Sequence, residues 1–268
     1  MNEEIHTVGM VIGSMPVGEA DKRLVLLTKE LGKVVVFAKG VKKVGAAFMA
    51  QSRIFAFGEF VLIRGRDSYR LIGAKISRYF EEVSADVERM CYGQYFLEFA
   101  DYYTHENMES GDMLLLLYQS LRALVKENIP NDLVKSTFEL RAMAINGEYT
   151  EGPPLRMRRR AVAHQGGRGR GQPDGGMAGP GSGAGHVDMW DTGTSDTAVE
   201  TAVETAWAHV LSAPIGSLYT FALSDGVLQK FRQNVGELRE RFIDRKFRSL
   251  DILEKVRGHV DKETVIYE

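Results

Sequence analysis

Residues 23–38 read RLVLLTKELGKVVVFA, and this stretch decides the fold of the first part of the chain. Two short runs rich in Val and Leu flank the turn Glu30-Leu31-Gly32-Lys33, which is the pattern of a β-hairpin. Similar runs lie on either side, and the expected strands are Val8 to Ile12, Arg23 to Thr28, Lys33 to Ala38, Glu59 to Arg64 and Tyr69 to Ser77. Five such strands are what a small closed OB-fold barrel needs, an architecture that recurs among proteins that bind single-stranded nucleic acid.

The periodicity changes after residue 80. From Ser84 to Tyr103 apolar residues recur every three or four positions, which predicts an amphipathic helix with Ser84 as its N-cap. Further helices are expected at Asp112 to Glu127, Asn131 to Ile145, Ser224 to Phe242 and Ser249 to Arg257, with acidic residues on the outer faces of the first three helices. We therefore expect an α+β multidomain chain: an OB-fold barrel at 1–80, a helical bundle at 81–152, an irregular Gly/Arg-rich insertion at 153–211 and the second part of the bundle at 212–268.

Composition excludes several classes of protein. The 268 residues include 34 Lys+Arg and 36 Asp+Glu, a formal net charge of -2, so the chain as a whole is not a polycation. The charge is segregated, however, because residues 1–80 are basic and residues 81–151 are acidic, which suggests a different partner for each unit. Cys91 is the single cysteine and rules out a disulfide framework within the chain. No signal peptide or membrane-spanning run is recognisable, so we expect a soluble cytoplasmic protein with no membrane partner.

Five short motifs resemble, in order and spacing, those of the bacterial DNA repair protein RecO family. They are Gly18-Glu19-Ala20-Asp21-Lys22-Arg23, Thr28-Lys29-Glu30-Leu31-Gly32-Lys33, Ala38-Lys39-Gly40-Val41-Lys42-Lys43, Phe138-Glu139-Leu140-Arg141 and Lys246-Phe247-Arg248-Ser249-Leu250. The resemblance covers residues 1–153 and 212–257. It implies an OB-fold followed by a helical domain that carries a zinc module. It also implies a nucleoid-associated protein without enzymatic activity that binds single- and double-stranded DNA, anneals complementary strands, engages single-strand-binding protein (SSB) and RecR, and helps to load RecA.

The insertion departs from that family pattern. The family usually carries four zinc-binding cysteines there, whereas this segment has none and offers only His164, His186 and His209, so we predict no metal and no other cofactor. Residues 152–186 contain eleven glycines and four prolines together with an Arg-rich run. Three interpretations remain: an arginine-glycine tether that contacts nucleic acid, a neutral disordered loop, or a stretch translated out of frame.

The codon table favours a displaced reading frame. Met189-Trp190 must be encoded by ATG-TGG, and one base later these bases contain the cysteine codon TGT. Met157-Arg158 gives another cysteine codon if Arg158 uses a CG codon. Our hypothesis is that compensating frame changes near Pro154 and before Ser212 have replaced a zinc module, which would make the tandem sequence at 197–204 accidental. Sequencing of the gene tests this hypothesis.

The basic residues of the barrel are the candidate DNA-binding site. The predicted DNA-binding residues are Lys22, Arg23, Lys29, Lys33, Lys39, Lys42, Lys43, Arg53, Arg64, Arg66 and Arg70. Each alone is more simply a solvated surface residue, but together they favour a cationic groove whose affinity falls with salt. Six aromatic residues could stack on bases, although most are expected in the core: Phe37, Phe48, Phe55, Phe57, Phe60 and Tyr69.

Catalytic interpretations have little support in this sequence. It has no phosphate-binding loop motif, Cys91 lies on the apolar face of an expected helix, and His6 and His105 are expected at the surface. On the same expected helix, Tyr95, Phe96 and Phe99 are more simply explained as bundle core than as a partner groove. Two functions remain: a DNA-binding, strand-annealing recombination mediator, or an adaptor that docks a protein partner and binds nucleic acid only weakly.

Overall fold

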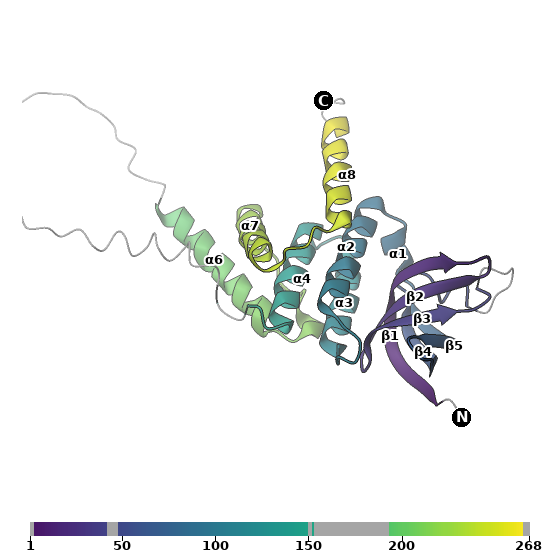
Figure 1. Cartoon of the computed structure of the whole chain (residues 1–268). Coiled ribbons are helices and arrows are strands. Elements are labelled where there is room, and N and C mark those ends of the chain that lie inside the picture. Colours follow the sequence, from purple (N-terminus) through teal and green to yellow (C-terminus); the bar gives the residue numbers. More distant parts are fainter. Residues whose placement is uncertain (1–2, 42–47, 150–151, 153–192, 265–268) are drawn as a thin grey trace, which may run out of the picture.

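The first part of the chain folds into the five strands that its apolar pattern predicts. They are β1 (Glu4–Val17), β2 (Asp21–Thr28), β3 (Gly32–Ala38), β4 (Phe57–Arg64) and β5 (Tyr69–Arg78). They close into an OB-fold barrel in the order β1-β2-β3-β5-β4, with β3 and β5 parallel and the other pairs antiparallel. This computed structural model describes residues 3–41, 48–149, 152 and 193–264 (Figure 1).

Strand β1 closes the barrel because it pairs with two neighbours in succession. Residues 4–10 pair with β4 and residues 9–17 pair with β2, with a break in register between Val11 and Gly13. The expected strand at Val8 to Ile12 is therefore only the centre of a strand of 14 residues. Closure leaves the β1 and β4 edges paired, so the barrel offers no free edge there.

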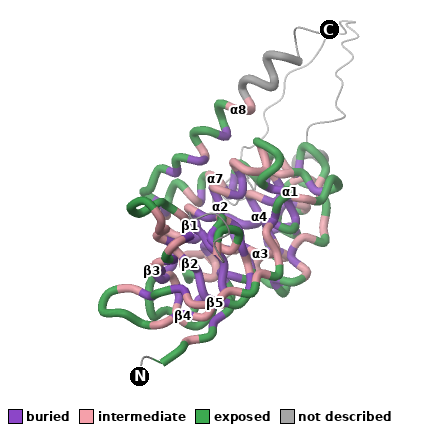
Figure 2. Tube along the Cα trace, turned by 90° about the vertical axis from the view of Figure 1, so that its right-hand side faces the viewer, coloured by how far each residue is buried: buried purple, intermediate pink, exposed green. Residues whose placement is uncertain are grey.

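The barrel and the helices are built around adjoining cores. Alternate residues of the strands fill the barrel, including Leu24, Val36 and Phe60, each fully buried. Met10 and Leu27 instead belong to the larger helical core, because β1 and β2 also pack against the helices. Figure 2 shows buried positions running from the strands into α2 and α4.

The helical domain is assembled from chain on both sides of the insertion. Its elements are α1 (Glu81–Ser84), α2 (Val87–Tyr103), α3 (Gly111–Leu124), α4 (Asn131–Ile145), α6 (Gly193–Ser212), η1 (Ile215–Ser217), α7 (Asp225–Phe242) and α8 (Arg248–Thr264). Among the described residues, no helix combines the length and the apolar composition that crossing a membrane requires. The predicted N-cap is wrong: Ser84 ends α1, and the carboxylate of Asp86 caps α2 by accepting the backbone N–H of Arg89 at 2.7 Å.

The expectation that the irregular insertion extends to residue 211 fails at its C-terminal end, where α6 forms. Val203, Trp207 and Val210 are buried, at the spacing of one helical face. The Trp207 ring lies 5.9 Å from that of Phe231 on α7. Residues 153–192, which carry the rest of the insertion, lie outside the described residues.

A joint between the β2–β3 turn and the α2–α3 loop fixes the barrel to the helical domain. Asn107 donates its backbone N–H to the carbonyl of Leu31 at 2.9 Å, and Lys33 donates its own to His105 at 3.1 Å. Gly32 has φ +69°, and an added Cβ would lie only 2.1 Å from the His105 carbonyl oxygen. Glycine is therefore required for this close approach of two backbones.

Candidate nucleic-acid interface

Strand pairing brings two of the predicted DNA-binding arginines to either side of an aromatic ring. Arg23 on β2 pairs with Phe37 on β3, and Phe37 pairs with Arg70 on β5. Their neighbours Leu24, Val36 and Leu71 are buried in the barrel, so these three side chains stand on its outer face. We call Arg23, Phe37 and Arg70 the outer row. Neighbouring strands lie about 4.8 Å apart, so the row presents cation, ring and cation side by side.

Phe37 differs from the other candidate aromatic residues in its packing. Phe55, Phe60 and Tyr69 are buried, which confirms that part of the expectation, and Phe48 and Phe57 pack against a core as partly buried residues. Phe37 is half-buried and packs against neither core cluster of the described residues. Among these six it is therefore the candidate for stacking on a flat ligand such as a base.

Four more of the predicted cations gather at the end of the barrel beside the outer row. Lys22 pairs with Ala38, which precedes Lys39, and Arg64 pairs with Tyr69, which precedes Arg70. Arg66 lies in the turn between β4 and β5. The carboxylate of Asp21 accepts the backbone N–H of Gly40 at 2.8 Å, which holds the segment after β3 against the β1–β2 turn. Lys22 also donates to the hydroxyl of Ser52 at 3.1 Å.

The remaining predicted cations are not brought to the outer row. Lys29 and Lys33 lie at the opposite end of the barrel, beside the joint with the helices. Lys33 is only 23% exposed, and its ammonium donates to the carbonyl oxygen of Asp101 at 2.6 Å and to its carboxylate at 3.0 Å. Arg53 lies 3.9 Å from Glu81. Lys42 and Lys43 fall outside the described residues.

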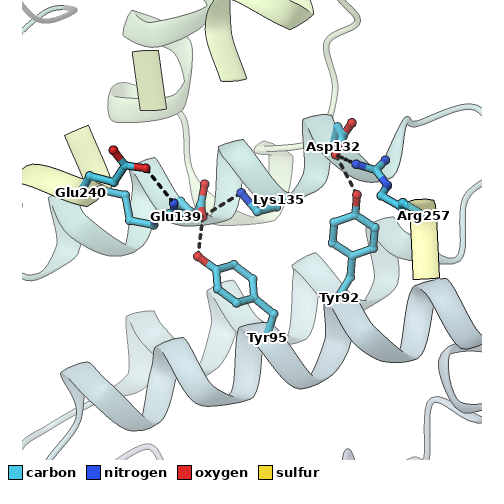
Figure 3. Close-up of polar contacts among 8 residues, drawn as sticks. Tyr92, Tyr95, Asp132, Lys135, Glu139, Glu240 and Arg257 are labelled. Atoms are coloured by element: carbon cyan, nitrogen blue, oxygen red, sulfur yellow. Dashed lines mark hydrogen bonds and ion pairs between the residues drawn. The ribbon is translucent and has the colours of Figure 1, made fainter. Parts of the chain in front are cut away.

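The sequence predicted that the acidic residues of α4 lie on its outer face, but two of them, Asp132 and Glu139, are largely or fully buried. Figure 3 shows Tyr92 and Tyr95 reaching from α2 to Asp132 and Glu139 on α4. Burial opposes ionisation of Asp132, but hydrogen bonds from Arg257 and Tyr92 outweigh it and lower the pKa of this carboxyl.

Glu139 is the most enclosed of these carboxylates. It is 1% exposed, and its Oε1 lies 2.9 Å from the Lys135 ammonium and 3.1 Å from the Arg239 guanidinium. Burial would raise its pKa, yet Lys135 and Arg239 lower it below the ordinary carboxyl value. Burial and the neighbouring Glu139 charge raise the pKa of the Tyr95 hydroxyl, which accordingly donates to Glu139.

Cations that follow the insertion neutralise acids that precede it. Arg257 of α8 donates to Glu88 at 3.2 Å and to Asp132 at 2.9 Å. Arg245 pairs with Asp101 at 3.4 Å. Part of the acidic charge of residues 81–151 thus serves contacts within the chain rather than an external partner, which corrects the simple inference from segment charges.

The motif Phe138-Glu139-Leu140-Arg141 connects helices on both sides of the insertion. Phe138 stacks in the helical core, with its ring 4.4 Å from that of Phe96. Arg141 donates to the carbonyl oxygens of Val210, at 3.1 Å, and of Leu211, both in the last turn of α6. In the later motif, Phe247 stacks on Phe99 with ring centroids 5.4 Å apart. These motifs hold the helical domain together.

The other residues that the sequence singled out have ordinary environments. Cys91 is partly buried against the helical core, and burial together with Glu88 raises the pKa of its thiol, which disfavours the reactive thiolate. His6 and His105 are exposed, as expected. His209 lies in α6, with Nε2 3.3 Å from the Leu218 carbonyl oxygen, whereas His164 and His186 fall outside the described residues.

Comparison with protein families gives two adjacent matches. Residues 1–80 match the model described as Recombination protein O N terminal, and residues 84–151 match Recombination protein O C terminal. The first model covers the barrel, and the second covers the helices from the end of α1 through α4. Together the two models match more than half of the chain.

Curated proteins give the same result. The chain is 32% identical over 143 residues to the DNA repair protein RecO of Alkaliphilus metalliredigens, an alignment that covers 53% of this chain and 58% of the relative. It is 32% identical over 139 residues to the protein of that name from an Exiguobacterium strain, covering 52% and 55%. A further relative from Exiguobacterium sibiricum is 33% identical over 135 residues, covering 50% and 54%. The chain spans little more than half the length of these relatives.

Proposed function

Since the chain belongs to the recombination protein O (RecO) family, we propose that it is a DNA repair and recombination mediator. In this proposal its barrel binds single- and double-stranded DNA and promotes annealing of complementary strands. It works with RecR to help load RecA on strands coated with SSB. It acts through binding alone, without enzymatic chemistry, and does so on nucleoid DNA in the cytoplasm.

The outer row is the observation that carries this proposal. A base stacks on an aromatic ring whatever its identity, and arginines beside the ring pair with the flanking phosphates. Arg23, Phe37 and Arg70 offer this combination in one register line across β2, β3 and β5. Lys39, Arg64 and Arg66 add positive charge at the same end of the barrel, so a strand that lies across the row meets cations on both sides.

The experiment compares two double variants that each remove two positive charges from the barrel. The test variant is Arg23→Gln with Arg70→Gln. The matched control is Lys29→Gln with Lys75→Gln, two exposed lysines further along the strands from the row. Binding of a fluorescent oligothymidine is measured by anisotropy across a salt series. The logarithm of the binding constant falls linearly with the logarithm of the salt concentration, and each phosphate contact contributes about 0.7 to the slope for single strands. The test variant loses two contacts, so its slope should be smaller by about 1.4 and its affinity at 0.1 M salt about 25-fold weaker.

Annealing of SSB-coated complementary strands is then measured with the same variants. The mediator proposal expects acceleration by the natural chain, loss of it in the Arg23→Gln/Arg70→Gln variant and little change in the control. Equal losses in both variants would mean that barrel charge in general, not the outer row, binds the strand. The adaptor function would be favoured if neither variant changed strand binding and the folded natural chain did not accelerate annealing.

A further inference from the structure

A second group of basic side chains, each paired with an acid, lines a cleft in the helical domain, far from the outer row in the fold. This cleft of about 400 Å³ opens between α4, α7 and α8. We call it the helical cleft. Its charged lining residues are Asp132, Lys135, Arg232, Arg239, Glu254 and Arg257. Along α7, Gln229, Arg232 and Gln233 line the cleft, and the amide of Gln233 donates to Glu237 at 3.1 Å.

The charges of the helical cleft are arranged in layers. The carboxylates lie underneath, since Asp132 is 12% exposed and Glu139, behind the lining, is 1% exposed. The guanidinium groups lie above them, because Arg232 is 46% exposed and Arg257 is 37% exposed. Arg232 reaches Asp132 at 2.5 Å, and Asp132 is also held by Arg257. An approaching anion therefore meets the donors of the arginines before it meets the carboxylates.

We propose that the helical cleft binds the phosphodiester backbone of a second nucleic-acid strand. Arginine forks and amide side chains are the groups that hold phosphate oxygens, and the two glutamines add neutral donors beside Arg232. Leu250 and Leu253 are the apolar side chains of the lining, so the cleft offers little to an apolar peptide anchor. Three acids with exposed side chains also lie beside these cations: Glu254 lines the cleft, Glu88 pairs with Arg257 and Glu240 pairs with Arg239.

The position of the cleft gives this site a role within the proposed function, on which the inference rests. Figure 1 shows α2 and α3 between the barrel and the pair α4 and α7. The outer row and the helical cleft therefore belong to opposite parts of the molecule. One chain could hold one strand at each, which brings two strands together before they anneal.

The experiment measures capture of one strand by another through the protein. Natural chain is saturated on a bead-bound oligothymidine of 15 nucleotides, and a fluorescent copy of the same non-complementary strand is then added. Two variants alter the helical cleft: Arg232→Gln removes a charge, and Gln229→Glu adds an anion at an exposed position one helical turn before Arg232, where it can compete with phosphate for that arginine. Arg248→Gln is the matched control, because Arg248 is exposed and does not line the cleft.

We expect both cleft variants to capture about fivefold less of the second strand at 0.1 M salt while the first strand stays bound, and the control to match the natural chain. Unchanged capture by both cleft variants would overturn the inference and leave the outer row untouched. The same substitutions in the Arg23→Gln/Arg70→Gln background separate the two sites. In the Arg23→Gln/Arg70→Gln variant, the strand binding that remains should fall again when Arg232→Gln is added. If the double variant binds no strand at all, the helical cleft is not a strand-binding site.

Two further outcomes are decisive. If the outer-row substitutions change nothing but Arg232→Gln abolishes binding, the barrel proposal fails and the cleft stands. A decapeptide of glutamate is added as a competitor, since carboxylates could use the same arginines. If the peptide binds the natural chain but not the cleft variants, and the oligothymidine binds all of them equally, the cleft takes an acidic protein segment and the inference is wrong.

Discussion

Replacing Glu139 by Gln removes the charge on which three helices converge, at almost constant side-chain volume. In the natural chain, Oε1 of Glu139 accepts from Tyr95 of α2, from Lys135 of its own helix and from Arg239 of α7. The variant keeps one oxygen acceptor but leaves two cations, 17% and 16% exposed, beside a neutral amide. Oε2 accepts no hydrogen bond among the described residues, so the new amide N–H₂ would take the place of a buried atom that has no hydrogen-bond partner.

The expected loss follows from these contacts. Hydrogen bonds to charged groups contribute about 1 kcal/mol more than neutral ones, and two cations lose that difference. A buried amide donor without a partner costs about 1–3 kcal/mol. The sum is about 3–5 kcal/mol, the range measured when one partner of a buried ion pair is removed. Such a change lowers the folding equilibrium constant more than a hundredfold.

Urea unfolding followed by circular dichroism at pH 7 measures this loss. Glu240→Gln is the control, because Glu240 is 75% exposed and lies 3.6 Å from the same arginine, and we expect it to change stability by less than about 0.5 kcal/mol. A double-mutant cycle with Arg239→Met should give a coupling of at least about 1 kcal/mol. A loss below 1 kcal/mol in Glu139→Gln, or no coupling, would refute the reasoning.

The same carboxylates set the dependence of stability on pH. The folded-state pKa values of Glu139 and Asp132 lie below their ordinary values. Their contribution is therefore complete above the ordinary carboxyl pKa and is lost as pH falls through that value toward the folded one. Between pH 7 and pH 3 the Glu139→Gln variant should lose less stability than the natural chain. An equal loss in both would assign the acid sensitivity to other groups.

Three more substitutions test separate parts of the structure. Phe37→Ala should weaken oligothymidine binding by about fivefold to 150-fold, the range for loss of one stacked base, while urea unfolding stays within about 0.5 kcal/mol because this ring belongs to neither core. A stability loss without a binding loss would make Phe37 structural. Gly32→Ala should lower the free energy of unfolding by at least about 2 kcal/mol, because its Cβ would meet the His105 carbonyl. Gly18→Ala, at φ +57° with open space around its Cβ, should lower it by about 1 kcal/mol. Equal losses would contradict the close approach of the two backbones at the joint. Trp207→Ala should cost about 3–5 kcal/mol, and a loss below 1 kcal/mol would mean that α6 does not pack on the domain.

The sequence predicts the barrel well because each strand alternates between a filled interior and an outer face. The segment Arg23 to Ala38 shows this, since Leu24, Leu26, Val34 and Val36 alternate with outward residues and are buried. Helix α6 was missed for the opposite reason. The glycines and prolines of 152–186 led to a predicted C-terminal boundary of the irregular insertion at residue 211, which includes nearly all of α6. Val199, Val203 and Val210 nevertheless have helical spacing in the sequence.

Counting charged residues in the sequence does not reveal which of them face solvent and which pair within the protein. Lys33 and Arg23 are equally basic in the sequence, but pairing sends Lys33 to Asp101 at the joint and Arg23 to the outer face beside Phe37. The roles of Asp132 and Glu139 depend on Arg257 and Arg239, which lie about 100 residues or more further along the chain. A pattern within one helix cannot reveal such partners. The spacing of Lys135 and Glu139 on an apolar helix was the local signal for this network.

Because the helical domain is built from chain on both sides of the insertion, it can be completed only late in synthesis of the chain. The barrel strands are complete once residue 78 has left the ribosome, but α8 supplies Arg257 about 180 residues later. At 5–20 residues per second this interval is roughly 10–35 s. During this interval Asp132 and Glu139 of α4 lack their arginines, and the aromatic residues of α2 lack the ring of Phe247 that packs against them. The nascent protein should therefore depend most on chaperones in that interval, when its barrel is already folded and its helical domain is still incomplete.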